Sequence, residues 1–170
     1  LTPLEGVPMG TRCGSIDPAI IPYLMGRTGM SAQEIDTYMN KKSGMLGISG
    51  ISSDFRDLAA ATKQGNERAA LARKMFTYKV RQFIGAYAAT LGGVDAIVMT
   101  AGVAENDGYI REMILQGLEY LGIDMNWEFN LSCPRATDLE ITNPTSKVHV
   151  YVIPTDEEMT IAHDTAALAL

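Results

Sequence analysis

Three short stretches of the sequence place charged side chains where they could bind an anionic ligand. Arg12 lies between glycines in MGTRCGSIDP, so its guanidinium can reach a carboxylate or phosphate without crowding. Asp54 and Arg56 flank Phe55 in SSDFRDL, directly after a segment rich in glycine and serine. Glu157 lies in IPTDEEM, at a predicted junction between a strand and a helix. These residue types indicate a site for an anion and its counter-ion.

A fourth stretch, DAIVMTAGVAEND, ends a short apolar run at Thr100 and continues into a turn with few bulky side chains. Gly102 lets the backbone approach a flat or charged ligand. The free amide groups at the start of the predicted helix 106–121 favour an anion. In open α/β sheets ligands bind beyond the carboxyl ends of strands, so this turn suits a nucleotide. It matches neither the P-loop nor the GxGxxG pattern, and a plain tight connection is the alternative.

The charged stretches also have structural alternatives. Asp54 could cap a helix, with Phe55 buried and Arg56 in solvent. The acids at 156–158 would complement a helix dipole even without a cation nearby.

The elements that must position these residues alternate between helix and strand. Asp17 and Pro18 predict a helix start, and Ser31 with Glu34 forms a capping box for a second helix to about Lys41. A structured loop is expected over 43–53 and the longest helix over 66–91. On that helix Leu71, Met75 and Tyr78 share a stripe, and Ala72 and Phe76 lie on a broader one; both are typical of core.

Strands are expected over 95–100, 138–142 and 148–153, with a last helix capped by Thr155 or Asp156. This alternation predicts an α/β fold with partly parallel strands.

Composition narrows the function classes. The chain has 170 residues and a formal net charge of −6. A net negative charge does not favour binding to nucleic acid or to an anionic membrane. No apolar run is long enough to span a bilayer. Cys13 and Cys133 have no metal-like spacing, so a cytoplasmic protein with reduced thiols is expected, with a single disulfide between them as the alternative. With His149 and His163 as the only histidines, a zinc site is not expected.

The four stretches TPLEGVPMGTRCGSIDPAI, KKSGMLGISGISSDFRDL, TAGVAEN and VIPTDEEMTIAHDTAALA resemble, in order and spacing, the C-terminal half of the acetate kinase family. The resemblance implies a ribonuclease H-like lobe of the actin, sugar kinase and Hsp70 type, with a mixed sheet flanked by helices. Residues 1–170 would be the C-terminal nucleotide-binding lobe of a two-lobe kinase, without its N-terminal lobe. The abrupt start at Leu1 also suggests a fragment.

The resemblance assigns roles to individual residues. Arg12 would be the catalytic arginine, and Glu157 would help to hold Mg²⁺ or Mn²⁺ through water. The expected nucleotide contacts for ATP or ADP are Asp54, Phe55, Arg56, Gly102, Val103, Ala104, Glu105 and Asn106. The family usually reads Gly-Ile-Gly-Glu-Asn in the turn, so Val103 and Ala104 depart from it. Ala104 disfavours a positive φ, which bears on how a nucleotide fits.

The implied reaction moves the γ-phosphoryl group of ATP to acetate, reversibly giving acetyl phosphate and ADP. A propionate kinase shares these motifs and is a close alternative. A nucleotide-binding or dimerisation module without turnover is another, and the isolated chain is expected to be inactive. The resemblance also implies a cytoplasmic homodimer formed through this lobe, with no nucleic acid or membrane partner. A relative that has lost catalysis is disfavoured because Arg12, Asp54 and Glu157 are all present.

Overall fold

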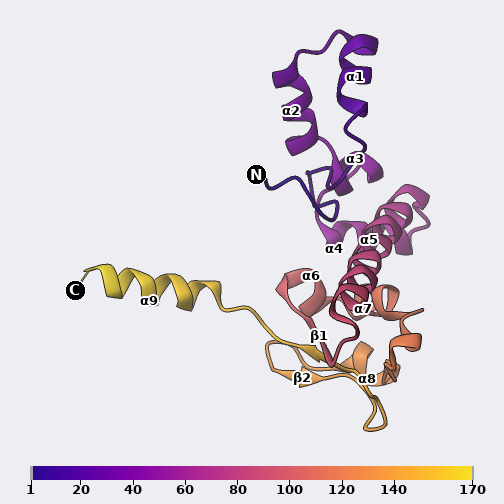
Figure 1. The fold of residues 1–170 in the computed structure, drawn as a ribbon, viewed down its shortest axis with the longest axis vertical. Helices are drawn as coiled ribbons and strands as arrows, with labels where there is room; N and C mark the ends of the chain where they lie inside the picture. The colour runs from indigo at the N-terminus through magenta and orange to yellow at the C-terminus, as the bar shows by residue number, and fades with distance from the viewer. Residues whose placement is uncertain (1, 170) are drawn as a thin grey trace. The chain divides into compact units, whose positions relative to one another are not determined.

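The computed structural model describes residues 2–169 and divides them into two compact units, one up to Ala86 and one from Tyr87 onward (Figure 1). The first unit is helical. Its elements are α1 (Ile20–Thr28), α2 (Ala32–Lys41), α3 (Gly44–Ser49), α4 (Phe55–Lys63) and most of α5 (Glu67–Leu91).

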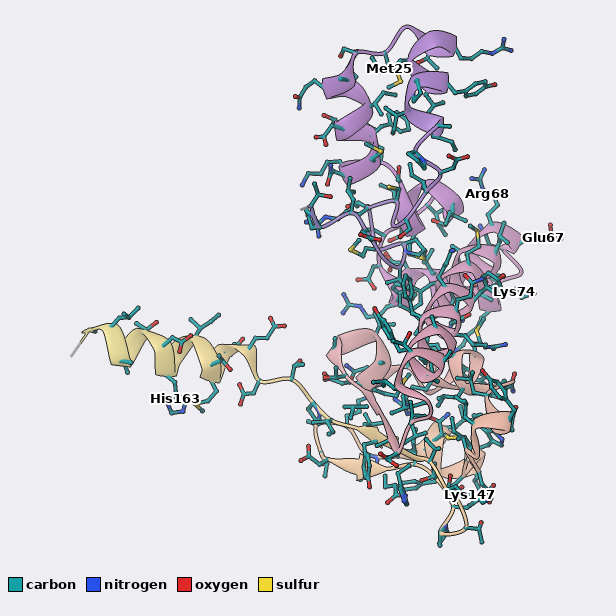
Figure 2. All side chains as sticks on the ribbon, viewed as in Figure 1. Met25, Glu67, Arg68, Lys74, Lys147 and His163 are labelled. Carbon is teal, nitrogen blue, oxygen red and sulfur yellow. The ribbon has the colours of Figure 1, made fainter. Side chains whose placement is uncertain are left out.

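The core of the first unit lies where α3, α4 and α5 meet. Met45, Leu58, Ala69 and Ala72 are fully buried there, and Phe55 and Phe76 pack against them with Ile48 and Ala61. Arg68, labelled in Figure 2, joins two of these helices because its guanidinium donates to the carbonyls of Ile48 (2.8 Å) and Gly47 (3.2 Å). The last turn of α3 is thereby held on α5.

The second unit contains a small mixed sheet flanked by helices. Its elements after α5 are β1 (Ala96–Met99), α6 (Ala101–Asn106), α7 (Gly108–Leu115), the 3₁₀ turn η1 (Glu119–Leu121), α8 (Trp127–Ser132), β2 (Leu139–Glu140), β3 (His149–Val152) and α9 (Glu157–Ala169). The strand order is β1-β3-β2, with β1 parallel to β3 and β2 antiparallel to it. Because β1 and β3 are parallel neighbours, α6 and the segment leading into α9 both leave the same edge of the sheet. The predicted α/β fold with a mixed sheet is confirmed.

The helix starts are partly as expected. The Ser31 and Glu34 capping box is present, and Asp156 accepts from the Met159 amide (3.0 Å) at the start of α9. The first helix begins at Ile20 rather than at Pro18, although the Asp17 carboxylate still accepts from the Ala19 amide (2.9 Å).

Three expectations about the elements were wrong, and one helix was missed. Residues 43–53 contain helix α3 rather than only a loop, and α8 was not anticipated. The predicted helix 106–121 is interrupted, because Asp107 ends α6 and caps α7 through the amides of Tyr109 and Ile110. The expected turn at Gly102 to Asn106 is helical and lies in α6, which begins with Ala101 in the left-handed region at φ 63°.

No helix within residues 2–169 combines the length and apolar character needed to cross a membrane.

Candidate functional site

Arg12 lies at the end of a tight loop that is bonded to the start of α3. The Met9 amide donates to the Arg12 carbonyl (3.0 Å), which closes the loop. The carbonyls of Met9 and Gly10 accept from the amides of Met45 (2.8 Å) and Leu46 (2.9 Å). The first amides of a helix lack partners within it, so the loop supplies them.

The guanidinium of Arg12 is half-buried, and the Met9 sulfur is its contact at 4.0 Å. Within residues 2–169 no carboxylate forms an ion pair with it. A positive charge on an ordered loop that no protein acid neutralises is available to an anionic substrate.

The Arg12 loop also contacts the segment that contains Asp54. A side-chain carbon placed on Gly10 would lie 3.2 Å from the carbonyl oxygen of Ser53, which is tight packing. The structure therefore brings two of the predicted stretches together in the first unit.

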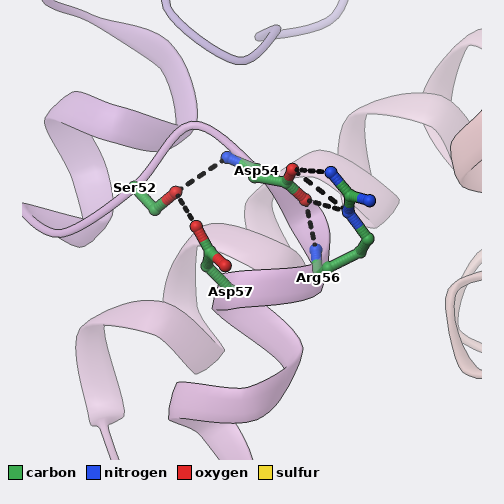
Figure 3. Close-up of polar contacts among 4 residues, drawn as sticks. All are labelled: Ser52, Asp54, Arg56 and Asp57. Atoms are coloured by element: carbon green, nitrogen blue, oxygen red, sulfur yellow. Dashed lines mark hydrogen bonds and ion pairs between the residues drawn. The ribbon is translucent and has the colours of Figure 1, made fainter.

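Asp54 performs the structural role that was weighed as an alternative (Figure 3). Its carboxylate caps α4 by accepting from the Arg56 amide (2.8 Å), and it forms an ion pair with the Arg56 guanidinium (2.6 Å). Ser52 accepts from the Asp54 amide (3.0 Å) and donates to Asp57 (2.7 Å). The hydrogen bonds from the Arg56 side chain, and next the one from its amide, lower the pKa of Asp54 to about 2.

This lowered pKa predicts an acid-sensitive step in stability. A carboxylate whose pKa is depressed in the folded state contributes fully above its unfolded value of about 4. The contribution is then lost as the pH falls towards about 2. Urea unfolding between pH 5 and pH 2.5 should show this loss, and Asp54→Asn should flatten it because asparagine retains a cap without the charge. An unchanged pH dependence in Asp54→Asn would contradict the assignment.

The side chains of Phe55 and Arg56 lie in different environments. The Phe55 ring packs edge-to-face on Phe76 with centroids 4.7 Å apart, so it belongs to the core of the first unit. The Arg56 side chain is 90% exposed and remains accessible to a ligand despite its ion pair. Nucleoside contact by these residues stays a prediction.

Gly102 and its neighbours form α6 in the second unit. A side-chain carbon on Gly102 would meet nothing within 4 Å, and the φ of Gly102 is not positive, so the protein itself does not require glycine there. Ala104 likewise has no positive φ, so its methyl group does not strain the backbone. An exposed helical turn without a side chain at position 102 leaves the backbone open to a flat ligand.

Glu105 joins α6 to the segment between β3 and α9. Its carboxylate accepts from the Thr155 amide (2.9 Å) and the Thr155 hydroxyl (3.1 Å), fifty positions along the chain. The predicted nucleotide turn is therefore bonded to Thr155, two residues before Glu157, the predicted metal-binding residue.

Glu157 fits a magnesium ion held mainly by phosphate and water. It is exposed in the first turn of α9, and no hydrogen bond or ion pair of its side chain occurs within residues 2–169. Across the same residues, no three His, Cys, Asp or Glu side chains gather as a metal site. Mg²⁺ usually keeps several waters and takes one or two carboxylates together with substrate phosphates, so an isolated carboxylate is compatible with this role. Binding of Mg²⁺ by Glu157 stays a prediction.

Arg111 and Asn130 are buried polar residues that the sequence did not suggest. Arg111 is 2% exposed and Asn130 is fully buried, and the guanidinium donates to the Asn130 side-chain oxygen at 2.7 Å. An arginine on an amphipathic helix is ordinarily assigned to solvent, so composition and periodicity carried no signal for this pair.

Comparison with known proteins places this geometry in a family. The sequence matches the Acetokinase family over residues 1–163. It is 56% identical over 164 residues to the acetate kinase of Methanosarcina acetivorans, covering 96% of this chain and 40% of that protein. The crystal structure of Porphyromonas gingivalis acetate kinase superposes with a TM-score of 0.91 at 46% identity, covering 99% of this chain and 42% of that one.

A propionate kinase from Francisella tularensis is also similar, with a TM-score of 0.85 and 37% identity over 95% of this chain and 40% of that one. The chain spans about 40% of the length of the curated relatives that it matches. The ribonuclease H-like assignment agrees with these neighbours. From its match over residues 1–163 and its 56% identity to a curated acetate kinase, the chain belongs to the acetokinase family.

Proposed function

We propose that this chain is the C-terminal nucleotide-binding lobe of an acetate kinase. The enzyme transfers the γ-phosphoryl group of ATP to acetate and reversibly gives acetyl phosphate and ADP. The observation that carries the proposal is Arg12, a half-buried guanidinium with no carboxylate partner within residues 2–169, on a loop packed against the Asp54 segment. Its place in a member of the acetokinase family supports the same role.

The chemistry requires charge neutralisation more than proton transfer. Acetate is ionised at neutral pH, so its oxygen attacks the phosphoryl group without a general base. Two anions must approach each other, and positioning with electrostatic stabilisation supplies nearly all of the catalysis. Arg12 binds the acetate carboxylate and stabilises the charge that spreads over the transferring group.

Each unit contributes one predicted nucleotide segment. Gly102 to Asn106 enclose adenine and ribose, and Asp54, Phe55 and Arg56 contact the nucleoside. The helical backbone at Ala104 supports normal nucleotide binding despite the departure from the family pattern. Glu157 holds Mg²⁺, or Mn²⁺, through water, and the ion neutralises phosphate charge when bound.

The test measures acetyl phosphate in the full-length enzyme and in the 170-residue chain alone. The full-length enzyme is expected to form acetyl phosphate from ATP and acetate, trapped with hydroxylamine. The isolated chain is expected to form none, because it spans about 40% of the length of its relatives. ATP-dependent acetyl phosphate formation by the purified chain would contradict the assignment to one lobe.

A propionate kinase is the second candidate because a propionate kinase is among the structural neighbours. The ratio of kcat/KM for acetate to that for propionate in the full-length enzyme decides between them. A value above one supports the acetate kinase proposal, and a value below one supports the alternative.

The proposed enzyme is also a cytoplasmic homodimer that forms through this lobe. Leu71, Met75 and Tyr78 form a stripe on α5 that is 42–59% exposed, so their assignment to the core was wrong for this chain, whereas Ala72 and Phe76 do contact the core. A second copy would cover such a stripe. The free thiols of Cys13 and Cys133 agree with a reducing compartment.

A further inference from the structure

We propose that Arg111 is a positioning residue for the nucleotide, acting through the backbone of α6. The inference rests on the proposed role of Gly102 to Asn106 in nucleotide binding. Arg111 lies on α7, outside the residues assigned to the site.

The guanidinium of Arg111 holds the last carbonyls of α6. One terminal nitrogen, Nη1, donates to the carbonyl oxygens of Ala104 (2.7 Å) and Glu105 (3.0 Å). The last carbonyls of a helix have no partner within it, and α6 has only six residues (Ala101–Asn106). A short helix gains little stability of its own, so such external bonds decide whether it forms.

The other side of the same guanidinium is anchored in α8. Its Nε donates to the Asn130 side-chain oxygen (2.7 Å), and Nη2 donates to the Asn130 carbonyl (2.6 Å) and the Cys133 sulfur (3.2 Å). The Asn130 side-chain amide in turn donates to the Gly108 carbonyl (2.9 Å), just beyond the end of α6. Arg111 therefore bridges a buried anchor and the proposed nucleotide segment.

The positive charge of Arg111 strengthens the hydrogen bonds that it donates to α6 and α8. Burial lowers the pKa of the guanidinium, whereas the nearby thiol of Cys133 and carboxylate of Asp107 favour its charged form. Within residues 2–169 its hydrogen bonds go to backbone carbonyls, the Asn130 side-chain amide and the Cys133 sulfur, and none goes to a carboxylate. Charged donors make stronger hydrogen bonds than neutral ones, and the planar fork can serve α6 and α8 together.

Two anchors then fix α6 from different directions. Arg111 holds its backbone carbonyls, and the Glu105 side chain holds the Thr155 segment. Loosening the first anchor would disorder the nucleotide segment of the second unit, whereas Arg12 belongs to the first unit. The expected consequence is a change in nucleotide binding rather than in the chemical step.

The first experiment compares Arg111→Lys with Arg135→Lys in the full-length enzyme. Lysine keeps the charge but cannot bond α6 and Asn130 simultaneously, so in Arg111→Lys the KM for ATP should rise about tenfold, equal to about 1.4 kcal/mol. The kcat and the KM for acetate should stay within threefold of their original values. Arg135→Lys makes the same substitution at an exposed arginine of the second unit, so it should leave all three parameters unchanged. A KM for ATP within twofold of the original in a folded Arg111→Lys would overturn the proposal, as would an equal loss in Arg135→Lys.

A second measurement needs no variant and holds if Arg111→Lys does not fold. In the full-length enzyme, Mg-ADP should shift the NMR signal of Arg111 Nε–H together with the amides of residues 102–106. ADP binding confirmed by calorimetry, without a change at Arg111 or α6, would overturn the positioning role. No binding of ADP at all would instead reject the proposed function, so the two failures are distinguishable.

Discussion

Replacing Arg12 with alanine is expected to lower the kcat for acetyl phosphate formation by about 10³-fold in the full-length enzyme. The guanidinium is half-buried, and within residues 2–169 no acid competes for it, so its charge is directed to substrate. Removing it leaves the attacking carboxylate and the phosphoryl group to repel each other without compensation. Steady-state assays with hydroxylamine trapping give kcat and both KM values.

Two further variants separate charge from geometry. Arg12→Lys should recover only part of the loss, because an ammonium lacks the planar fork that binds a carboxylate through two parallel bonds. Arg27→Ala removes an exposed arginine from the last turn of α1 and should leave kcat unchanged. Added guanidine should partly restore Arg12→Ala. If Arg12→Ala keeps its kcat within a few-fold, the catalytic assignment is wrong.

Local sequence signals predicted an element correctly where the residues of that element alone determine its structure. The capping box at Ser31 and Glu34 was identified from four residues, and the helix at 67–91 from its apolar periodicity. The strands β1 and β3 were each recognisable as a short apolar segment, one ending at Thr100 and the other before Pro154. Partly parallel strands were expected from the helices between them. The structure shows that β1 and β3 themselves pair in parallel.

The sequence was insufficient where a distant contact decides the structure. The glycines in 43–53 disfavour a helix, yet α3 forms because the carbonyls of Met9 and Gly10 bond its first amides and Arg68 bonds its last carbonyls. In the same way, α6 was interpreted as a turn because its anchor, Arg111, follows it in a separate helix. Tertiary hydrogen bonds outweigh propensity in both cases.

In the candidate site, too, residue types were predictable from the sequence, whereas the contacts between distant segments were not. Residue type and a glycine-rich context singled out Arg12, and the family resemblance gave it a role. Neither showed that Gly10 packs against Ser53 or that Glu105 bonds Thr155. Asp54 could be interpreted both as a cap and as a nucleoside contact, and the structure shows the cap. The contact with nucleoside stays a prediction.

Replacing Gly44 with alanine is expected to destabilise the first unit by about 3 kcal/mol. Gly44 has φ +58°, and a side-chain carbon there would lie 2.6 Å from the Arg12 carbonyl oxygen and closer still to that of Met9. These are backbone atoms, so no side chain can rotate away and the Arg12 loop itself must move. The bonds from the amides of Met45 and Leu46 to this loop should then break. Urea unfolding measures the total loss, and faster hydrogen exchange at those two amides locates it.

The matched control is Gly29→Ala, which isolates backbone strain from steric collision. Gly29 has φ +74° at the end of α1, similar to Gly44, but nothing lies within 4 Å of a side-chain carbon placed there. Its cost should be about 1 kcal/mol, from the left-handed backbone alone. The difference between the two variants measures how firmly the Arg12 loop is held on α3. Equal losses would mean that the loop yields freely, and its position would then be too soft to align a catalytic arginine.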